Sequence, residues 1–434
     1  MGNRNELVDL IGVGIGPFNL SLAALLEDVP EIDAVFFEQK SQFDWHPGML
    51  IEGTKLQVPF LADLVTMANP KSQYSFLNYL TEHDRMYAFY FLQRLDMPRR
   101  EYNDYCQWVA GQLDSCKFGK TVVNVKHIEA EEPYFEVEVY DSETESVEKI
   151  KGKNMVLGTG STPGMPSSFR GMPEDDVFHT ADFRNHQKRC REAKSITVVG
   201  SGQSAAEVFR ELLKEQRDHH YRLDWLTRSS GFLSMEESKL NLEHFSPDYV
   251  NYFYQLPQEK KDEIFATQDL LYKGISMHTI TDIYNLLYEM SVGGETLDVG
   301  LQTLTEVNEI KKEGNTYKLK CEQREQEKEF THESEVVIVG TGYRPNIPEF
   351  ILSLESFLQW DEHGRYKVGP DYRLKQSSAT PNEVYVHSGI SHSHGVGSTN
   401  LGLAVHRNKV IINHLTGRPV YRISEQNVFQ NFEV

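Results

Sequence analysis

The sequence predicts an α/β fold with two Rossmann-like dinucleotide-binding units and a helical insertion. Two glycine-rich loops, at residues 12–17 and 200–205, each follow a short apolar run and precede a helical pattern. This strand–turn–helix context is typical of a loop that carries a dinucleotide pyrophosphate. After the second unit, residues 235–291 interrupt the strand–helix alternation with a purely helical pattern. We therefore expect one polypeptide to hold two dinucleotides, the arrangement that passes a hydride from a nicotinamide to a flavin.

Composition and charge limit the possible classes of function. The 434 residues are enough for about two or three domains with sizeable cores. The formal net charge of −20 argues against nucleic acid as a partner, because phosphate binding needs clustered Lys and Arg. No apolar stretch approaches the ~20 residues that span a bilayer, so no membrane partner is expected.

The cysteines and histidines show no metal or disulfide pattern. Cys106, Cys116, Cys190 and Cys321 are scattered without a C-x-x-C pair, which indicates a reducing, cytoplasmic location. A redox-active disulfide and a zinc ribbon are excluded for the same reason. His392-x-His394 lacks a third ligand at a suitable spacing, so no metal site is expected.

The first unit has the features of an FAD site. An apolar strand at 8–11 leads through the loop into a helix at 18–26, and a second strand at 34–37 ends in an acidic residue. The glycines let the backbone approach a pyrophosphate, and the acid accepts hydrogen bonds from a ribose hydroxyl. The cofactor-binding residues predicted in this unit are Gly12, Gly14, Gly16, Pro17 and Glu38.

The second unit differs at the ribose position. Its strand at 195–199 leads into a helix at 205–214, and the next strand, at 222–226, is followed by Thr227-Arg228-Ser229. No carboxylate occupies the place of the ribose acid. Arg228 with Ser229 beside it fits the 2′-phosphate of NADPH. An ordinary solvated arginine is the alternative.

Two apolar strands that end in Gly-Thr-Gly, at 155–160 and 336–342, are typical of the closing turns of such domains. The predicted FAD-binding domain comprises residues 1–165 and 344–434. The predicted NADPH-binding domain comprises residues 166–234 and 292–343, and residues 235–291 form a helical substrate-binding segment. Aromatic residues at helical spacing in this segment favour packing over direct ligand contact.

Four stretches resemble the N-hydroxylating flavoprotein monooxygenases of siderophore biosynthesis, the lysine and ornithine N-monooxygenase family. They are Asp9–Leu20, Trp45–Met49, Leu56–Val65 and Gly340–Tyr343. This resemblance implies that NADPH reduces FAD, that O2 adds at flavin C4a, and that the hydroperoxide hydroxylates a terminal amine. It also implies a homotetramer.

The resemblance implies roles for single residues. Trp45, His46 and Met49 would lie along the isoalloxazine and Gln57 near its reacting face, so His46 and Gln57 are the candidate catalytic residues. A purely structural, hydrogen-bonded His46 is equally compatible with the sequence. The further residues implied at the NADPH loop and around the flavin are Gly200, Gly202, Gln203, Ser204, Thr341, Gly342, Tyr343, His394, Ser398, Thr399 and Leu401.

The substrate is predicted from two departures from the family pattern. Ala62 stands where the ornithine and lysine hydroxylases carry a Lys that meets the amino-acid substrate, and Leu271 stands where ornithine enzymes carry an Asn. A buried carboxylate without its cation costs several kcal/mol, so a substrate without a carboxylate is favoured. We therefore expect a diamine, putrescine or cadaverine. Glu243 is the candidate anchor for its distal ammonium, and a solvated helix carboxylate is the alternative.

Other functions are compatible with parts of the sequence. The nearest is an L-lysine N6-monooxygenase, or an L-ornithine N5-monooxygenase, with an unidentified carboxylate partner. A pyridine-nucleotide disulfide reductase would need a cysteine pair, which is absent. A Baeyer–Villiger or sulfur-oxidising flavin monooxygenase is suggested faintly by residues 169–171 and 179–180. A non-enzymatic flavin redox sensor would not need the helical insertion.

Overall fold

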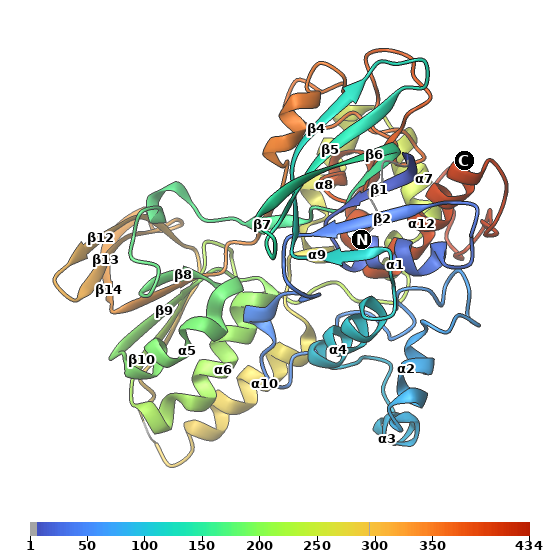
Figure 1. Ribbon diagram of the computed structural model, residues 1–434. Coiled ribbons are helices and arrows are strands. Elements are labelled where there is room, and N and C mark those ends of the chain that lie inside the picture. The colour runs from blue at the N-terminus through green and yellow to red at the C-terminus, as the bar shows by residue number, and fades with distance from the viewer. Residues whose placement is uncertain (1–6, 295) are drawn as a thin grey trace.

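The computed structural model describes residues 7–294 and 296–434, which form two lobes joined by a pair of crossing segments (Figure 1). The first lobe is built on a seven-stranded sheet in the order β3-β2-β1-β6-β5-β4, with β17 also paired to β6. Strands β1, β2, β3, β6 and β17 are parallel, and β4 and β5 extend the sheet antiparallel. Their bounds are β1 Leu7–Val13, β2 Ala34–Glu38, β3 Cys116–Phe118, β4 Lys120–Ile128, β5 Tyr134–Asp141, β6 Ser146–Leu157 and β17 Val384–Val386.

Helices α1 (Pro17–Leu26) and α12 (Leu401–Thr416) pack against each other in this lobe. Nearly all of α1 is buried, because the helix itself carries apolar residues on every face, as expected for a helix inside a core. The 3₁₀ turn η1 (Pro47–Met49) follows β2, and the short helix α11 (Ser391–His394) and the turn η6 (Val396–Thr399) precede α12. Helix α4 (Arg99–Ala110) contacts α1, while α2 (Phe76–Glu82) and α3 (Met86–Leu92) project from the lobe (Figure 1).

The second lobe is a five-stranded parallel sheet in the order β11-β10-β9-β15-β8, flanked by helices α5 (Phe183–Glu192) and α6 (Gln203–His219). A separate antiparallel sheet, β12-β13-β14, lies at its outer end (Figure 1). The bounds are β8 Val177–His179, β9 Ser195–Val199, β10 Arg222–Leu226, β11 Val299–Gln302, β12 Thr305–Glu313, β13 Thr316–Gln323, β14 Lys328–Ser334 and β15 Val336–Val339.

The chain leaves the first lobe through β7 (Ser161–Pro163) and returns through β16 (Tyr343–Pro345). These two strands pair antiparallel, with Tyr343 opposite Pro163. The Gly164 N–H also donates to the Gly342 carbonyl at 2.8 Å. These two connecting strands therefore lie side by side.

The predicted helical segment is divided between the lobes and is not a separate unit. Its elements are η4 (Asn241–Phe245), α7 (Pro247–Gln255), α8 (Gln258–Thr267), α9 (Asp269–Tyr272) and α10 (Met277–Met290). Helices α7 and α8 contact α11 of the first lobe, whereas α10 packs along α6 of the second. The boundary predicted at residue 291 thus falls after a helix that belongs with the second lobe.

The predicted fold class, with its two Rossmann-like units, is confirmed. Strands β1, β2, β9, β10 and β15 lie where the sequence placed them, but α6 begins at Gln203 and continues to His219, beyond the predicted end. Among the residues that the structure describes, no helix is long and apolar enough to cross a membrane.

Candidate dinucleotide and substrate sites

The first glycine loop leaves open space at the start of α1. Gly14 has a φ of 83°, and a Cβ there would lie 2.7 Å from the Gly158 carbonyl oxygen. Gly16 is the N-cap of α1, and an added Cβ would have no heavy atom of the described residues within 4 Å. None of the described side chains caps this helix, so its first N–H groups are available to an anion. The cradle fits a pyrophosphate.

Glu38 ends β2 beside this loop. Its Oε2 accepts from the Ile15 N–H at 2.9 Å and its Oε1 accepts from the Lys40 N–H at 3.0 Å. The carboxylate therefore shapes the loop and keeps lone pairs for further donors, because each of its oxygens can accept more than one hydrogen bond. This placement fits a ribose at the end of β2, as FAD binding requires.

A buried cation lies behind the loop. The Arg407 guanidinium on α12 donates to the Ser398 carbonyl at 2.8 Å and to the His387 carbonyl, between the rings of Phe18 and Tyr372. Among the described residues no carboxylate pairs with it. The two carbonyl oxygens and the faces of the two rings stabilise the buried cation in place of a carboxylate. No sequence motif marks Arg407, because a lone Arg inside a helical pattern looks like a solvated residue.

The second glycine loop packs closely on the turn that follows β15. Gly200 has a φ of 124°, and a Cβ there would lie 2.1 Å from the Gly340 carbonyl oxygen. Gly202 caps α6 without a bond from any described side chain. Beyond β10, the Ser229 hydroxyl lies 3.1 Å from that of Ser201, and the Arg228 side chain is 73% exposed, with Glu306 at 3.8 Å. Arg228 is therefore free to meet a 2′-phosphate.

Gln203 and Ser204 are engaged inside the protein. The Gln203 amide donates to Glu207 and Thr279, each at 3.0 Å, and its oxygen accepts from the Ser276 N–H at 2.7 Å. Its side chain joins α6 to α10, so the predicted contact of this residue with NADPH would come from its backbone N–H at the start of α6. The Ser204 hydroxyl accepts from the Thr180 hydroxyl at 3.2 Å.

Aromatic rings line the junction of the lobes. The His46 ring lies 4.8 Å from Trp45 and 5.6 Å from Tyr343, and His179 packs on the other side of Tyr343 at 5.2 Å. Burial, with the charges of Arg99 and Lys40, lowers the His46 pKa to about 4, so the ring is neutral at physiological pH. Burial raises the Tyr343 pKa to about 12. A neutral imidazole and a protonated phenol therefore lie together at the junction of the lobes.

The rest of the predicted closing turn holds the crossing segments together. The Thr341 hydroxyl donates to the Gly164 carbonyl at 2.6 Å. The Gly342 carbonyl accepts from His179 Nε2 at 3.0 Å. Both contacts place the turn beside the rings of Tyr343 and His46, between the two dinucleotide loops.

The side chain of Met49 points into the second lobe. It is buried in the core of that lobe with Ile51 and Phe183, so the predicted contact of this residue with the flavin would come from its backbone. Gly48 beside it packs so closely that a Cβ would lie 1.9 Å from the Ala181 carbonyl. Residues 47–51 thus form a plug between the lobes.

A buried ion pair holds this plug, and the sequence did not reveal it. Arg99 on α4 forms two hydrogen bonds of 2.9 Å with Glu207 on α6 and donates to the Met49 carbonyl at 3.0 Å. The two residues are far apart in sequence, and neither stands in a recognisable motif. A bidentate pair of this kind fixes the relative orientation of the lobes.

The remaining predicted flavin residues lie on the first lobe. Gln57 and Thr399 are exposed, Leu401 begins α12, and the Ser398 hydroxyl lies 2.7 Å from that of Ser391. His394 is buried against Tyr372 with its Nδ1 on the Ser393 hydroxyl, so its ring acts in packing. Among the described residues no group of three or more His, Cys, Asp or Glu is placed to hold a metal ion.

Ala62 lies against the start of α12. The side chain is 4% exposed, and a Cβ built on Gly402 would lie 3.7 Å from its methyl and 3.9 Å from Met67 Cε. No room for a longer side chain exists on that side without movement. The predicted substrate wall is therefore apolar here. Leu271 packs in the aromatic cluster of Tyr249 and Phe253, which explains an apolar residue at that position.

Glu243 binds residues near the end of the chain. Its carboxylate accepts from the N–H groups of Phe429 and Gln430, at 3.2 and 3.0 Å, and from the Gln430 side chain at 3.1 Å. These donors occupy much of the acceptor capacity of the carboxylate, so a substrate ammonium would share it with the end of the chain. The carboxylate also stays partly accessible to solvent, as the alternative expects.

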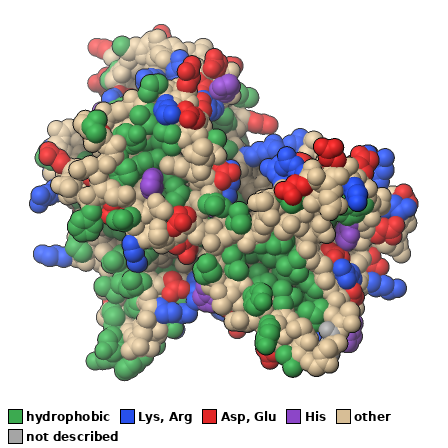
Figure 2. All heavy atoms as spheres, turned by 180° about the vertical axis from the view of Figure 1, so that it is seen from behind, with side chains coloured by type: hydrophobic (Ala, Val, Ile, Leu, Met, Phe, Trp, Pro, Cys, Tyr) green, Lys and Arg blue, Asp and Glu red, His purple; other side chains and the backbone are tan. Residues whose placement is uncertain are grey.

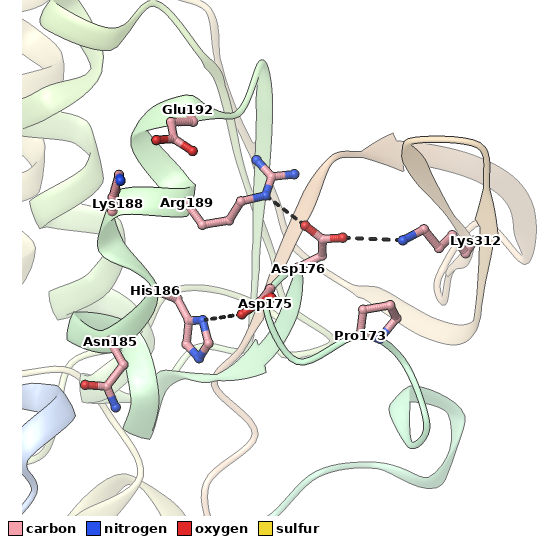
Figure 3. Close-up of a pocket in the computed structure, with 9 residues that line it drawn as sticks. All are labelled: Pro173, Asp175, Asp176, Asn185, His186, Lys188, Arg189, Glu192 and Lys312. Carbon is pink, nitrogen blue, oxygen red and sulfur yellow. Dashed lines mark hydrogen bonds and ion pairs between the residues drawn. The ribbon is translucent and has the colours of Figure 1, made fainter.

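A polar hollow of about 580 Å³ on the second lobe is not the active site (Figure 3). Arg189 and Lys312 both point toward Asp176, at 2.8 and 3.6 Å, and His186 points toward Asp175 at 3.7 Å. These charges pair with one another. The hollow also lies before β8, whereas ligands of parallel sheets bind at the carboxyl ends of the strands.

Two open glycine loops at the carboxyl ends of parallel strands, facing an aromatic junction, define a two-dinucleotide flavoprotein oxidoreductase. The family model described as L-lysine 6-monooxygenase/L-ornithine 5-monooxygenase matches residues 6–345. The chain belongs to this family, which confirms the resemblance found in its sequence.

Individual relatives cover almost the whole chain. A putrescine N-hydroxylase of Acinetobacter baumannii is 38% identical over 99% of this chain and 94% of that protein. The crystal structure of an FAD-bound cadaverine monooxygenase from the desferrioxamine pathway of Erwinia amylovora has a TM-score of 0.95 and 37% identity, covering 99% of both chains. An ornithine N-hydroxylase from Kutzneria, with reduced FAD, NADP+ and L-ornithine, has a TM-score of 0.88 and 27% identity over 95% of this chain and 99% of that one.

Proposed function

We propose that the protein is an FAD- and NADPH-dependent monooxygenase that hydroxylates one terminal amine of a diamine, putrescine or cadaverine, in hydroxamate siderophore biosynthesis. The observation that carries the proposal is the buried methyl of Ala62 against Gly402, on the wall where a cation would be needed for an amino-acid carboxylate. The similarity to a putrescine and a cadaverine enzyme supports the same substrate class.

We assign one cofactor to each glycine loop. FAD would lie on Gly14, Gly16 and Glu38, with its flavin end toward His46 and Tyr343. NADPH would lie on the Gly200 loop, with Arg228 at its 2′-phosphate. When bound, the reduced flavin supplies the activated oxygen, and the protein supplies orientation and exclusion of water.

The chain's own contribution to the reaction concerns protons and water. The attacking amine must be neutral, although its pKa in water is about 10.4, and desolvation in an apolar pocket lowers that pKa. His46 is neutral at physiological pH, so it adds no cation beside the flavin. The plug at residues 47–51 fills part of the junction between the lobes and would help to keep water from the bound flavin.

The domain assignment follows the packing. We propose that residues 166–234 and 292–343 form the NADPH-binding domain, that residues 7–165 and 344–434 form the FAD-binding domain, and that α7 to α9 form the substrate cap. Helix α10 is better grouped with the NADPH-binding domain because it packs along α6. Residues 1–6 of the predicted first domain lie outside the described residues.

We propose a homotetramer in the cytoplasm. Helix α3 projects from the first lobe and exposes Tyr87, Tyr90 and Phe91, and Figure 2 shows this projection covered by hydrophobic side chains at lower left. Exposed apolar patches of this kind mark association surfaces. All four cysteines are free and buried, as suits a reducing compartment. Sedimentation of the purified protein tests the oligomeric state, and a monomer would contradict it.

The substrate is tested with purified, FAD-loaded protein and four amines: putrescine, cadaverine, L-lysine and L-ornithine. We expect amine-dependent NADPH oxidation with nearly equimolar hydroxylamine for one or both diamines. We expect mainly hydrogen peroxide with the amino acids. Efficient coupling with L-lysine or L-ornithine, and inert diamines, would overturn the diamine assignment. NADPH oxidation that no amine stimulates would favour the flavin redox sensor.

A further inference from the structure

We propose that residues 424–432, the C-terminal strap, position the wall of the substrate site formed by η4 and the start of α7. This inference rests on the proposed function, because it concerns the site of that reaction. Figure 1 places the end of the chain beside α7. The strap thereby becomes part of the machinery that binds the amine, although it follows the last helix of the fold.

Two carboxylates bind the strap. Glu243 on η4 accepts from the backbone N–H groups of Phe429 and Gln430, and Asp248 on α7 accepts from the Asn427 N–H at 3.1 Å and from its side-chain amide at 2.8 Å. The Gln430 amide also donates to the Leu240 carbonyl at 2.5 Å. Hydrogen bonds to ionised acceptors are stronger than neutral ones, so these contacts are well suited to order a segment without secondary structure.

One aromatic side chain completes the attachment. Phe432 packs against His244, Tyr249 and Tyr252, with ring centroids 5.5, 5.0 and 6.2 Å apart. Phe429 points away from the protein and is 93% exposed. The strap therefore carries one aromatic residue that is an anchor and one that is not, which gives a matched pair for mutation.

The wall of the substrate site that binds the strap lies next to the proposed flavin site. A Cβ built on Gly397 would lie 3.4 Å from Val250 and 3.8 Å from the His244 carbonyl. Gly397 precedes Ser398, whose carbonyl accepts from Arg407. A displacement of η4 would thus alter the boundary between the substrate cap and the flavin-closing segment, while both glycine loops would keep their geometry.

The main test compares the FAD-loaded wild-type enzyme with three altered forms and one control, each assayed with the preferred amine. The altered forms are a chain truncated after Arg422, Glu243→Ala and Phe432→Ala, and the control is Phe429→Ala. We expect KM for the amine to rise about 10-fold or more in the three altered forms, the size expected for a lost charge-assisted hydrogen bond. The hydroxylamine yield per NADPH should also fall. The FAD content, the KM for NADPH and the behaviour of Phe429→Ala should match the wild type.

A double-mutant cycle separates the strap from an ammonium anchor. If Glu243 acts by holding the strap, adding Glu243→Ala to the truncated chain has no further effect on KM. If Glu243 binds the substrate ammonium, the truncated chain still loses affinity when Glu243 is changed. Additive effects, an unchanged KM after truncation, or a parallel loss of FAD and thermal stability would each overturn the proposal. Wild-type enzyme that hydroxylates no amine would instead refute the proposed function.

Discussion

The two glycine loops share a backbone design but differ in their surroundings. The first is enclosed: α12 packs along its helix, Asn408 donates to the Phe18 carbonyl at 3.1 Å, and the buried Arg407 lies behind it. The second opens to solvent, with its ribose-end residue Arg228 largely exposed. The first loop therefore suits a cofactor that stays bound through many turnovers, and the second suits one that binds and leaves. Under the proposed assignment, the enclosure of the first loop and the exposure of the second, rather than the glycines, would distinguish a resident FAD from an exchanging NADPH.

The largest effect is expected from a methyl group added to each loop in turn. Gly14→Ala strains a left-handed residue and forces contact with Gly158, so we expect protein purified without flavin absorbance. Gly200→Ala meets Gly340 and should keep its FAD while losing reduction by NADPH. Flavin content and anaerobic reduction measure both. Loss of FAD in both variants would contradict the proposed assignment of FAD to the first loop and NADPH to the second.

Arg228→Ala should raise the KM for NADPH about 10- to 100-fold, because a charge-assisted contact with the 2′-phosphate is lost. The KM for NADH should not change. Arg324→Ala is the matched control, since Arg324 is also exposed and also lies 3.8 Å from Glu306. Equal effects on NADPH and NADH would show that Arg228 does not recognise the phosphate.

Ala62→Lys should lower diamine turnover about 10-fold, because a like charge enters the wall beside the enclosed loop. Ala62→Met adds a side chain of similar length without charge, so it separates the effect of side-chain size from the effect of charge. Steady-state hydroxylamine formation is the measurement. Indistinguishable rates for wild type and Ala62→Lys would place position 62 outside the substrate site.

A smaller effect is expected from pH. His46 has a pKa of about 4 in the folded protein against 6.5 unperturbed. Between these values the unfolded chain binds a proton that the folded protein does not, so the free energy of unfolding falls as pH falls from 6.5 toward 4. Denaturant titrations should show a shallower fall for His46→Gln. The exposed His363→Gln serves as control, and identical slopes for all three would contradict the burial of His46.

Local sequence patterns predicted both loops because their information is contained in a few adjacent residues. The glycines, the following helices and Glu38 all lie where a strand–turn–helix pattern requires. Contacts between distant segments were not predicted. Gln203 is tied to α10, Met49 enters the core of the other lobe, and Glu243 binds residues near the chain end. Periodicity cannot reveal these partners, and a charged or polar residue looks the same whether it binds ligand or protein.

The division of the helical segment has the same cause. Residues 235–291 are uniformly helical in pattern, yet α7 and α8 pack on the first lobe while α10 packs on the second. An amphipathic pattern indicates that one face of a helix is packed, but it does not identify the element against which that face packs. Arg99 and Glu207, which join the lobes, were missed for this reason as well.

The most direct test of the account is the ratio of hydroxylamine formed to NADPH consumed by the wild-type enzyme with putrescine or cadaverine, set beside L-lysine. A ratio near unity for a diamine, and mostly peroxide for L-lysine, is the predicted result. A ratio near unity for L-lysine, with peroxide from both diamines, would contradict it.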